Sequence, residues 1–140
     1  MRCVCVVEGA PVGKGRPRVT RYGTYTPKKT VDYEERVRLA WKKHTSGFHF
    51  PEKTPLRLSV VTYSPIPKSY TKKEKLELPG TPVLKKPDWD NIGKIICDAL
   101  NGVAWDDDSS VTCGTVKKRY AAPDTYPDGA VLFCVEEDLE

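Results

Sequence analysis

The chain has 140 residues, 39% of them hydrophobic, which suits one domain, residues 1–140, with a single modest core. Its net charge of +4 is compatible with a nucleic-acid partner, although a surplus of this size is weak evidence by itself. No apolar run approaches the length of a membrane span and no signal peptide is evident, so we expect a cytoplasmic protein with no membrane partner.

A basic segment follows the first predicted strand, residues 2–7. Between residues 10 and 30 there is no acidic residue and there are six basic ones: Lys14, Arg16, Arg18, Arg21, Lys28 and Lys29. A P-loop is excluded, because only three residues separate Gly9 from Gly13-Lys14 where that motif needs four. The glycines and prolines favour an extended loop whose cations bind DNA phosphates. A solvated charged loop is the competing interpretation.

The middle of the chain predicts a helix, a strand and a second, shorter helix. Thr30 is the expected cap of the first helix, whose buried face consists of Tyr33, Val37, Ala40 and Trp41. Residues 56–63 alternate like a half-buried strand. Thr71 and Glu74 form a capping box at the start of a short lysine-rich helix.

Residues 85–111 contain a third predicted helix with two different faces. Its apolar face repeats at helical spacing and consists of Ile92, Ile95, Ile96 and Ala99, before the stop signal Asn101-Gly102. Asp90, Lys94 and Asp98 follow one another at i, i+4 and i+8 and form a polar stripe away from the isoleucines. Pro87 disfavours helix before it, so we expect Asp88 in the extended lead-in and Asp90 near the cap.

A second acidic cluster, Asp106, Asp107 and Asp108, precedes a predicted strand at residues 111–120. Two carboxylates about 4 Å apart repel by about 4 kcal/mol at an effective dielectric of about 20, so a fold that clusters them normally supplies a cation. Oxygen ligands without histidine or thiolate indicate a hard ion, Mg²⁺ or Mn²⁺. The competing interpretation of Asp88 and Asp90 is a helix cap with a solvated neighbour.

A last strand is predicted at residues 130–135. Strands and helices are mixed without strict βαβ alternation, so the predicted class is α+β, a mixed β-sheet with packed helices. The five cysteines form an odd set without a C-x-x-C pair, which excludes a disulfide framework and a zinc site: Cys3, Cys5, Cys97, Cys113 and Cys134.

Several of these motifs together resemble the RusA family of Holliday-junction resolvases. They are KPDWDNIGK, then DALNG, then a DD pair followed by two residues and valine, with GKGRPR and YTPKKT near the N-terminus. The resemblance implies a RusA-like fold in which three aspartates bind the catalytic metal and a lysine one helical turn on supports cleavage. By the motif these residues are Asp88, Asp90, Asp108 and Lys94. An extra Asp106 and the Ser110 that replaces a common glutamine leave Asp107 open as an alternative to Asp108.

The activity implied by the resemblance is Mg²⁺-dependent nicking of four-way DNA junctions by a homodimer, in DNA recombination and repair. Asn91 and Asp107 are candidates for orienting the metal ligands or a water. Asp98 is interpreted as a partner of Lys94 at i+4. Two alternatives stay open, a branched-DNA-binding module without cleavage activity and a metal-dependent phosphatase of small phosphoesters, although the second leaves the basic loop without a purpose.

Overall fold

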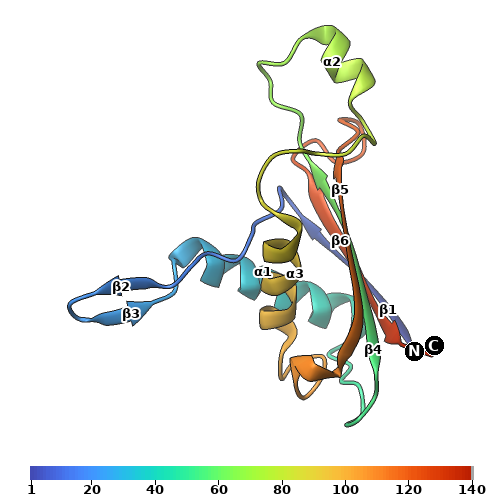
Figure 1. Ribbon diagram of the computed structural model, residues 1–140. Helices are drawn as coiled ribbons and strands as arrows, with labels where there is room; N and C mark the ends of the chain where they lie inside the picture. The colour runs from blue at the N-terminus through green and yellow to red at the C-terminus, as the bar shows by residue number, and fades with distance from the viewer. Residues whose placement is uncertain (140) are drawn as a thin grey trace.

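A mixed four-stranded sheet forms the centre of the computed structural model, which describes residues 1–139 (Figure 1). The strand order is β1-β6-β4-β5, and only β4 and β5 run parallel. The elements in chain order are β1 (Arg2–Glu8), β2 (Arg18–Thr20), β3 (Gly23–Tyr25), α1 (Lys28–Thr45), β4 (Leu56–Ser64), α2 (Lys72–Glu77), α3 (Trp89–Leu100), a 3₁₀ turn (Asp108–Ser110), β5 (Val111–Tyr120) and β6 (Ala130–Glu137). The predicted α+β class is confirmed.

The parallel pairing of β4 and β5 explains the position of α3. Two parallel strands cannot be joined by a tight turn and need a long crossover connection. Here the crossover contains α2 and α3, and α3 packs against the sheet beside α1 (Figure 1). The start of α3, with Asp88 and Asp90, and the second acidic segment just before β5 therefore belong to one connection.

The hydrophobic core lies between one face of the sheet and these two helices. The alternation of β1, β4 and β6 sends Cys5, Leu58 and Phe133 into the core, where α1 contributes Trp41. The rings of Trp41 and Phe133 stack with centroids 6.5 Å apart. Ile92, 1% exposed, and its apolar neighbours fix α3 to this core, and each such buried side chain contributes about 1.5–3 kcal/mol.

Helix α1 begins earlier than the sequence predicted. Its N-cap is Pro27, and Thr30 lies inside the first turn, buried, without acting as a cap. The Thr30 hydroxyl instead accepts a hydrogen bond of 3.1 Å from the backbone N–H of Gly15. The predicted cap therefore serves a tertiary contact, which the local pattern of a capping residue cannot distinguish from a cap.

The predicted extended basic loop is partly a hairpin. Strands β2 and β3 pair antiparallel through a turn at Arg21-Tyr22, after which Gly23 opens β3 with a φ of 126°. All six strand residues are exposed, and the hairpin projects away from the sheet and helices (Figure 1).

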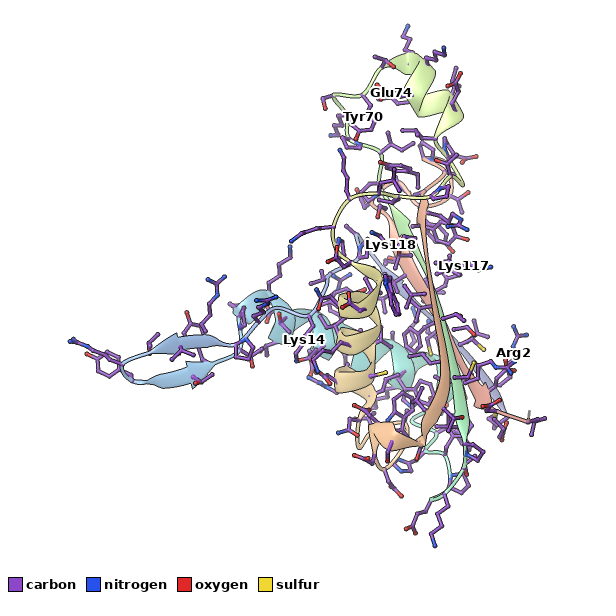
Figure 2. The ribbon with its side chains drawn as sticks, viewed as in Figure 1. Arg2, Lys14, Tyr70, Glu74, Lys117 and Lys118 are labelled. Carbon is purple, nitrogen blue, oxygen red and sulfur yellow. The ribbon has the colours of Figure 1, made fainter. Side chains whose placement is uncertain are left out.

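The predicted capping box of helix α2 is confirmed. The backbone N–H of Thr71 donates a hydrogen bond to the Glu74 carboxylate, and the backbone N–H of Glu74 donates one to the Thr71 hydroxyl. It has no buried residue and projects from another end of the molecule, near the labelled Tyr70 and Glu74 in Figure 2. Over residues 1–139, none of the helices combines the length and apolarity that spanning a membrane requires.

Candidate active site

The polar stripe of α3 is present as predicted. Asp88 is the N-cap in an extended conformation, with φ −71° and ψ 151°, and its side chain makes no capping bond. Asp90 lies in the first turn, where its Oδ1 accepts a hydrogen bond of 3.0 Å from the backbone N–H of Asn91. Lys94 is 61% exposed and lies 3.7 Å from Asp98 Oδ2. The core holds α3 by its isoleucines, so the carboxylates and Lys94 face outward.

The three aspartates of the second acidic segment have different partners. Asp106 Oδ1 lies 2.7 Å from Nε2 of His49, whose pKa this hydrogen bond raises. Asp107 caps the 3₁₀ turn by accepting hydrogen bonds from the side chain and backbone of Ser109, which lower the pKa of Asp107. Asp108 Oδ1 accepts a 2.8 Å hydrogen bond from the Trp105 indole.

Asp108 is the member of this segment that faces α3. Burial raises the pKa of the Asp108 carboxyl, the Trp105 hydrogen bond opposes this rise, and the nearby charges of Asp98 and Asp107 add to it. The ammonium of Lys94 acts in the opposite direction and lowers the pKa of Asp108. Helix α3 packs against β5, which begins just after Asp108, and this packing explains why the charges of Lys94 and Asp98 affect the Asp108 carboxyl.

The structure does not gather Asp88, Asp90 and Asp108 into a finished metal site. Among residues 1–139, no three His, Cys, Asp or Glu side chains lie close enough to hold one metal ion. The donor chemistry nevertheless suits a hard divalent cation, because all three candidates are carboxylates on exposed or half-exposed positions. The fold brings Asp108 to Lys94 and Asp98, while Asp88 and Asp90 stay in the first turn of α3.

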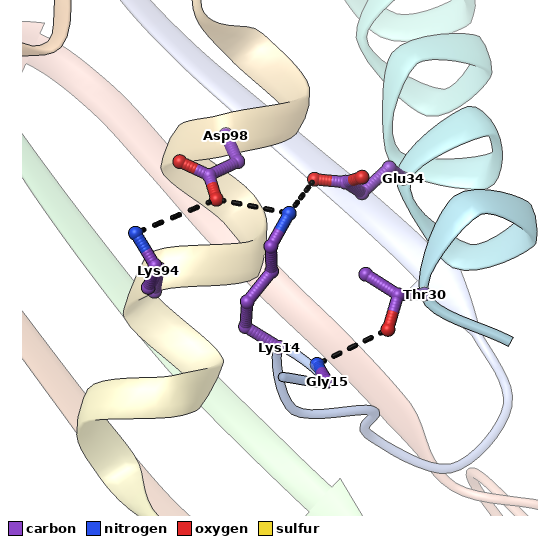
Figure 3. A network of polar contacts seen from close by, with 6 residues as sticks. All are labelled: Lys14, Gly15, Thr30, Glu34, Lys94 and Asp98. Atoms are coloured by element: carbon purple, nitrogen blue, oxygen red, sulfur yellow. Dashed lines mark hydrogen bonds and ion pairs between the residues drawn. The ribbon is translucent and has the colours of Figure 1, made fainter. Parts of the chain in front are cut away.

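Lys14, one of the cations predicted to bind DNA phosphates, forms ion pairs within the protein. Its Nζ lies 3.1 Å from Glu34 Oε2 on α1 and 3.0 Å from Asp98 Oδ2 on α3, so it bridges the two helices (Figure 3). Burial alone would lower the pKa of Lys14, but the hydrogen bonds to Asp98 and Glu34 together raise it. Only 18% of its side chain is exposed, and Lys94 reaches the same Asp98 carboxylate from the other side.

The loop around Lys14 packs tightly against both helices. The backbone N–H of Lys14 donates to the carbonyl of Asn91 at 3.0 Å, in addition to the bond between Gly15 and Thr30. A Cβ added at Gly13 would lie only 2.8 Å from Cβ of Pro87, and one at Gly15 only 2.6 Å from Oγ1 of Thr30. The glycines of this segment therefore permit close approach to α1 and α3.

An open groove of about 910 Å³ lies between this loop, the start of α1 and the start of α3. Its basic lining residues include Arg16, Arg18, Lys29 and Lys86, and its acidic one is Asp88. The remaining cations predicted to bind DNA lie elsewhere. Arg21 is near the tip of the hairpin, where it packs over the ring of Tyr22, and Lys28 pairs with Asp32 at 2.6 Å.

The interpretation of the sequence missed three features of this region: the helix-bridging role of Lys14 with Glu34, the Trp105 hydrogen bond to Asp108, and the hairpin. Only the hairpin has a local signal, Gly23 between two short runs that contain residues favouring strands. The ion pair of Lys14 with Glu34 joins residues twenty positions apart. The bond from Trp105 to Asp108 is local, but it depends on the buried position of the indole, which no pattern in the sequence indicates.

The comparisons with known proteins agree with the motifs. The sequence profile of the family described as "Endodeoxyribonuclease RusA" matches residues 8–126, which include the basic loop, α3 and both acidic segments. The uncharacterized protein YqaN of Bacillus subtilis (strain 168) is 36% identical over 133 residues, an alignment that covers 86% of this chain and 90% of YqaN.

Proposed function

The chain belongs to the RusA family of endodeoxyribonucleases, and on that premise we propose that it nicks four-way DNA junctions in a reaction that depends on Mg²⁺ or, as a substitute, Mn²⁺. The biological setting that fits this activity is DNA recombination and repair. The observation that supports the proposal is the position of α3, which packs against β5 just after Asp108 and whose first turn borders a groove lined with basic side chains.

Lys94 is the cation best placed to act on the reacting phosphate. Its side chain is 61% exposed, in contrast to Lys14, and it projects from α3 one turn after Asp90. An ammonium in this position would stabilise the negative charge that grows on the phosphate or on the leaving oxygen. Asp98, at 3.7 Å, would keep the Lys94 side chain on this side of the helix.

Asp88, Asp90 and Asp108 are the residues that would hold the metal. A hard divalent cation bound by these carboxylates would supply Lewis acidity at the phosphate. Trp105 holds one oxygen of Asp108 in place. Asn91 lines the groove next to Asp88, and Asp107 shapes the 3₁₀ turn that presents Asp108, so both would act by orienting these ligands.

DNA would lie along the basic groove and beyond it. Arg16, Arg18 and Lys29 line the groove and would bind backbone phosphates, and Arg21 and Lys28 extend this positive surface onto the hairpin and the start of α1. Lys14 contributes indirectly, because its ion pairs fix the loop that carries Arg16.

A homodimer fits this activity, because resolving a four-way junction requires two nicks in strands related by symmetry. The sheet face opposite α1 and α3 carries no helix (Figure 1). Two cross-strand rows lie on this face: Val4, Cys134 and Ser59, and beside them Val6, Leu132 and Val61. Val4 is 48% exposed. This partly apolar face is the surface that we assign to a second copy of the chain.

A branched-DNA-binding module without cleavage activity is the second candidate. It is favoured by one observation, that residues 1–139 do not gather three potential metal ligands. Both candidates predict binding of junctions, and only the nuclease predicts strand scission.

The test is the nicking of an end-labelled four-way junction with and without Mg²⁺. The wild type is expected to nick the junction only with the cation, and Asp90→Asn is expected to abolish nicking while junction binding persists. Asp124→Asn, in the exposed turn between β5 and β6, is the matched control. Nicking by Asp90→Asn at the wild-type rate would contradict the site, and binding without nicking by the wild type would favour the second candidate.

A further inference from the structure

Trp89 is a large aromatic side chain left in solvent at the candidate active site. It is 63% exposed, whereas the other two tryptophans, Trp41 and Trp105, are 0% and 1% exposed. Its position in α3, three residues before the buried Ile92, continues the apolar face of the helix by one turn. Ile92 is the first residue of α3 that is buried in the core, so the indole of Trp89 lies on the apolar side of the helix but is not covered by core side chains.

The surroundings of Trp89 favour one kind of occupant. Asp88 and Asp90, its neighbours in the chain, are proposed metal ligands, and Asp88 lines the basic groove together with Lys86. A polyanion is therefore expected next to the indole. The apolar, planar part of a nucleic acid is the nucleobase, and base stacking on an exposed aromatic ring is a common way of binding it. A protein partner on this spot would leave the basic groove unexplained.

We propose that Trp89 stacks on a nucleobase next to the phosphate that is cleaved. The bases inside a continuous duplex have both faces covered by their neighbours, whereas a branch point or a strand end exposes a stacking face. Trp89 would thus favour branched over linear DNA, which makes it a residue that determines specificity. The inference rests on the proposed function and adds to it the feature of the DNA that is recognised.

Intrinsic fluorescence provides a direct test, because Trp89 is the exposed indole of the three. The binding of an unlabelled four-way junction in EDTA is expected to quench the emission of the wild type. Trp89→Phe keeps a ring that can stack and removes the reporting indole, so its emission is expected to change far less. An equal change in both proteins would show that a buried indole is responsible and would overturn the inference.

Affinity provides the second test, again in EDTA so that any change in metal binding by the neighbouring aspartates has no effect. Base stacking contributes about 1–3 kcal/mol, so Trp89→Ala should weaken junction binding by about 5-fold to 150-fold. Trp89→Phe should stay within about three-fold of the wild type. Linear duplex of the same length should be affected far less, so the ratio of junction to duplex affinity should fall. Leu39→Ala, which removes a 56% exposed apolar side chain from α1, is the matched control.

The outcomes separate this inference from the proposed function. Junction affinity of Trp89→Ala equal to that of the wild type would overturn the inference, even if the wild type cleaves junctions. The wild type could show quenching, and Trp89→Ala could lose affinity, while the wild type never nicks DNA. That result would support stacking by Trp89 and would contradict the proposed nuclease activity. An equal loss of affinity for junction and duplex would also overturn it, because the indole would then not detect the branch.

Discussion

Asp107 and Asp108 are adjacent in the chain, but their carboxylates serve different purposes. Oδ2 of Asp107 accepts two hydrogen bonds from Ser109 in the 3₁₀ turn, and these bonds lower the pKa of Asp107. Asp108 is partly buried, is held by Trp105, and interacts with the charges of Lys94 and Asp98. At the scale of single residues, these contacts favour Asp108 as the metal ligand and Asp107 as the residue that shapes the turn.

A pair of substitutions distinguishes the two roles. Asp108→Asn should abolish Mg²⁺-dependent nicking, because it removes a ligand charge next to Lys94, and should leave junction binding intact. Asp107→Asn should lower the melting temperature slightly and keep a measurable rate, because asparagine is also a good capping residue. Nicking rates and melting curves of both variants are the measurements. Loss of nicking in Asp107→Asn alone would reverse the assignment.

Substitutions of Lys14 and Arg16 should have separate effects, one on stability and the other on DNA binding. Lys14→Ala leaves Glu34 and Asp98 without their shared cation at 12% and 28% exposure, so unfolding should become easier by about 1–2 kcal/mol after allowance for solvent screening. Arg16→Ala should leave stability unchanged and reduce the slope of log affinity against log salt by about 0.9 for one lost phosphate contact.

Lys28→Ala is the control for stability, because its pair with Asp32 is exposed and such pairs contribute little. Chemical denaturation and salt titration of junction binding provide the two readouts. If Lys14→Ala is as stable as the wild type and its slope of log affinity against log salt is reduced, Lys14 binds a DNA phosphate.

The candidate site was predictable where it depends on local spacing. The stripe Asp90, Lys94, Asp98 follows from helical periodicity, and the structure places all three on the outer side of α3. The partner of Lys14 was not predictable, because Lys14 lies in a loop and Glu34 is twenty residues away in sequence, on α1. For the same reason the sequence could not assign the Asp108 environment, which depends on how the crossover returns to β5.

At the scale of elements, strands were predicted best. The predicted strands at residues 56–63, 111–120 and 130–135 differ from β4, β5 and β6 by two residues at most, because alternation along a half-buried strand is a strong local signal. Segment 18–25 was interpreted as loop, since its strands have three residues each and bury nothing. Without a buried face a strand shows no hydrophobic alternation.

This hairpin should be dispensable for folding and needed for DNA binding. Replacing residues 19–24 with a short glycine linker should change the free energy of unfolding by less than about 0.5 kcal/mol, because the removed side chains are exposed. Junction affinity should fall, and its salt dependence should weaken, because Arg21 is removed. Denaturation curves and binding at several salt concentrations test this. A large loss of stability would show that the hairpin packs on the body of the protein in solution.

At the scale of the whole molecule, the start of α3 lies between two projecting basic segments. The hairpin with Arg18 and Arg21 extends on one side, and the lysine-rich α2 with Lys72 and Lys73 extends on another (Figures 1 and 2). Glu136 and Glu137 end β6 close to the C-terminus, away from both projections (Figure 1). This distribution directs a polyanion toward α3 and away from the end of β6.

The helix-free face of the sheet provides the last prediction. Leu132 and Val61 are paired across β6 and β4 in the middle of this face, with Lys117 on the neighbouring β5. If two copies meet there, the wild type should have twice the chain mass of 15.7 kDa, and a buried charge at Leu132→Glu should give a monomer with an unchanged circular dichroism spectrum. Leu39→Glu, which places the same charge on the exposed side of α1, should remain dimeric.

Light scattering at equal concentrations measures the mass of the three proteins. A wild-type monomer bound to a junction would refute the dimer, whereas a dimeric Leu132→Glu would place the contact on another surface. Since one active site cuts one strand, the monomeric variant should still nick single strands of a junction but lose the paired cuts that resolve it.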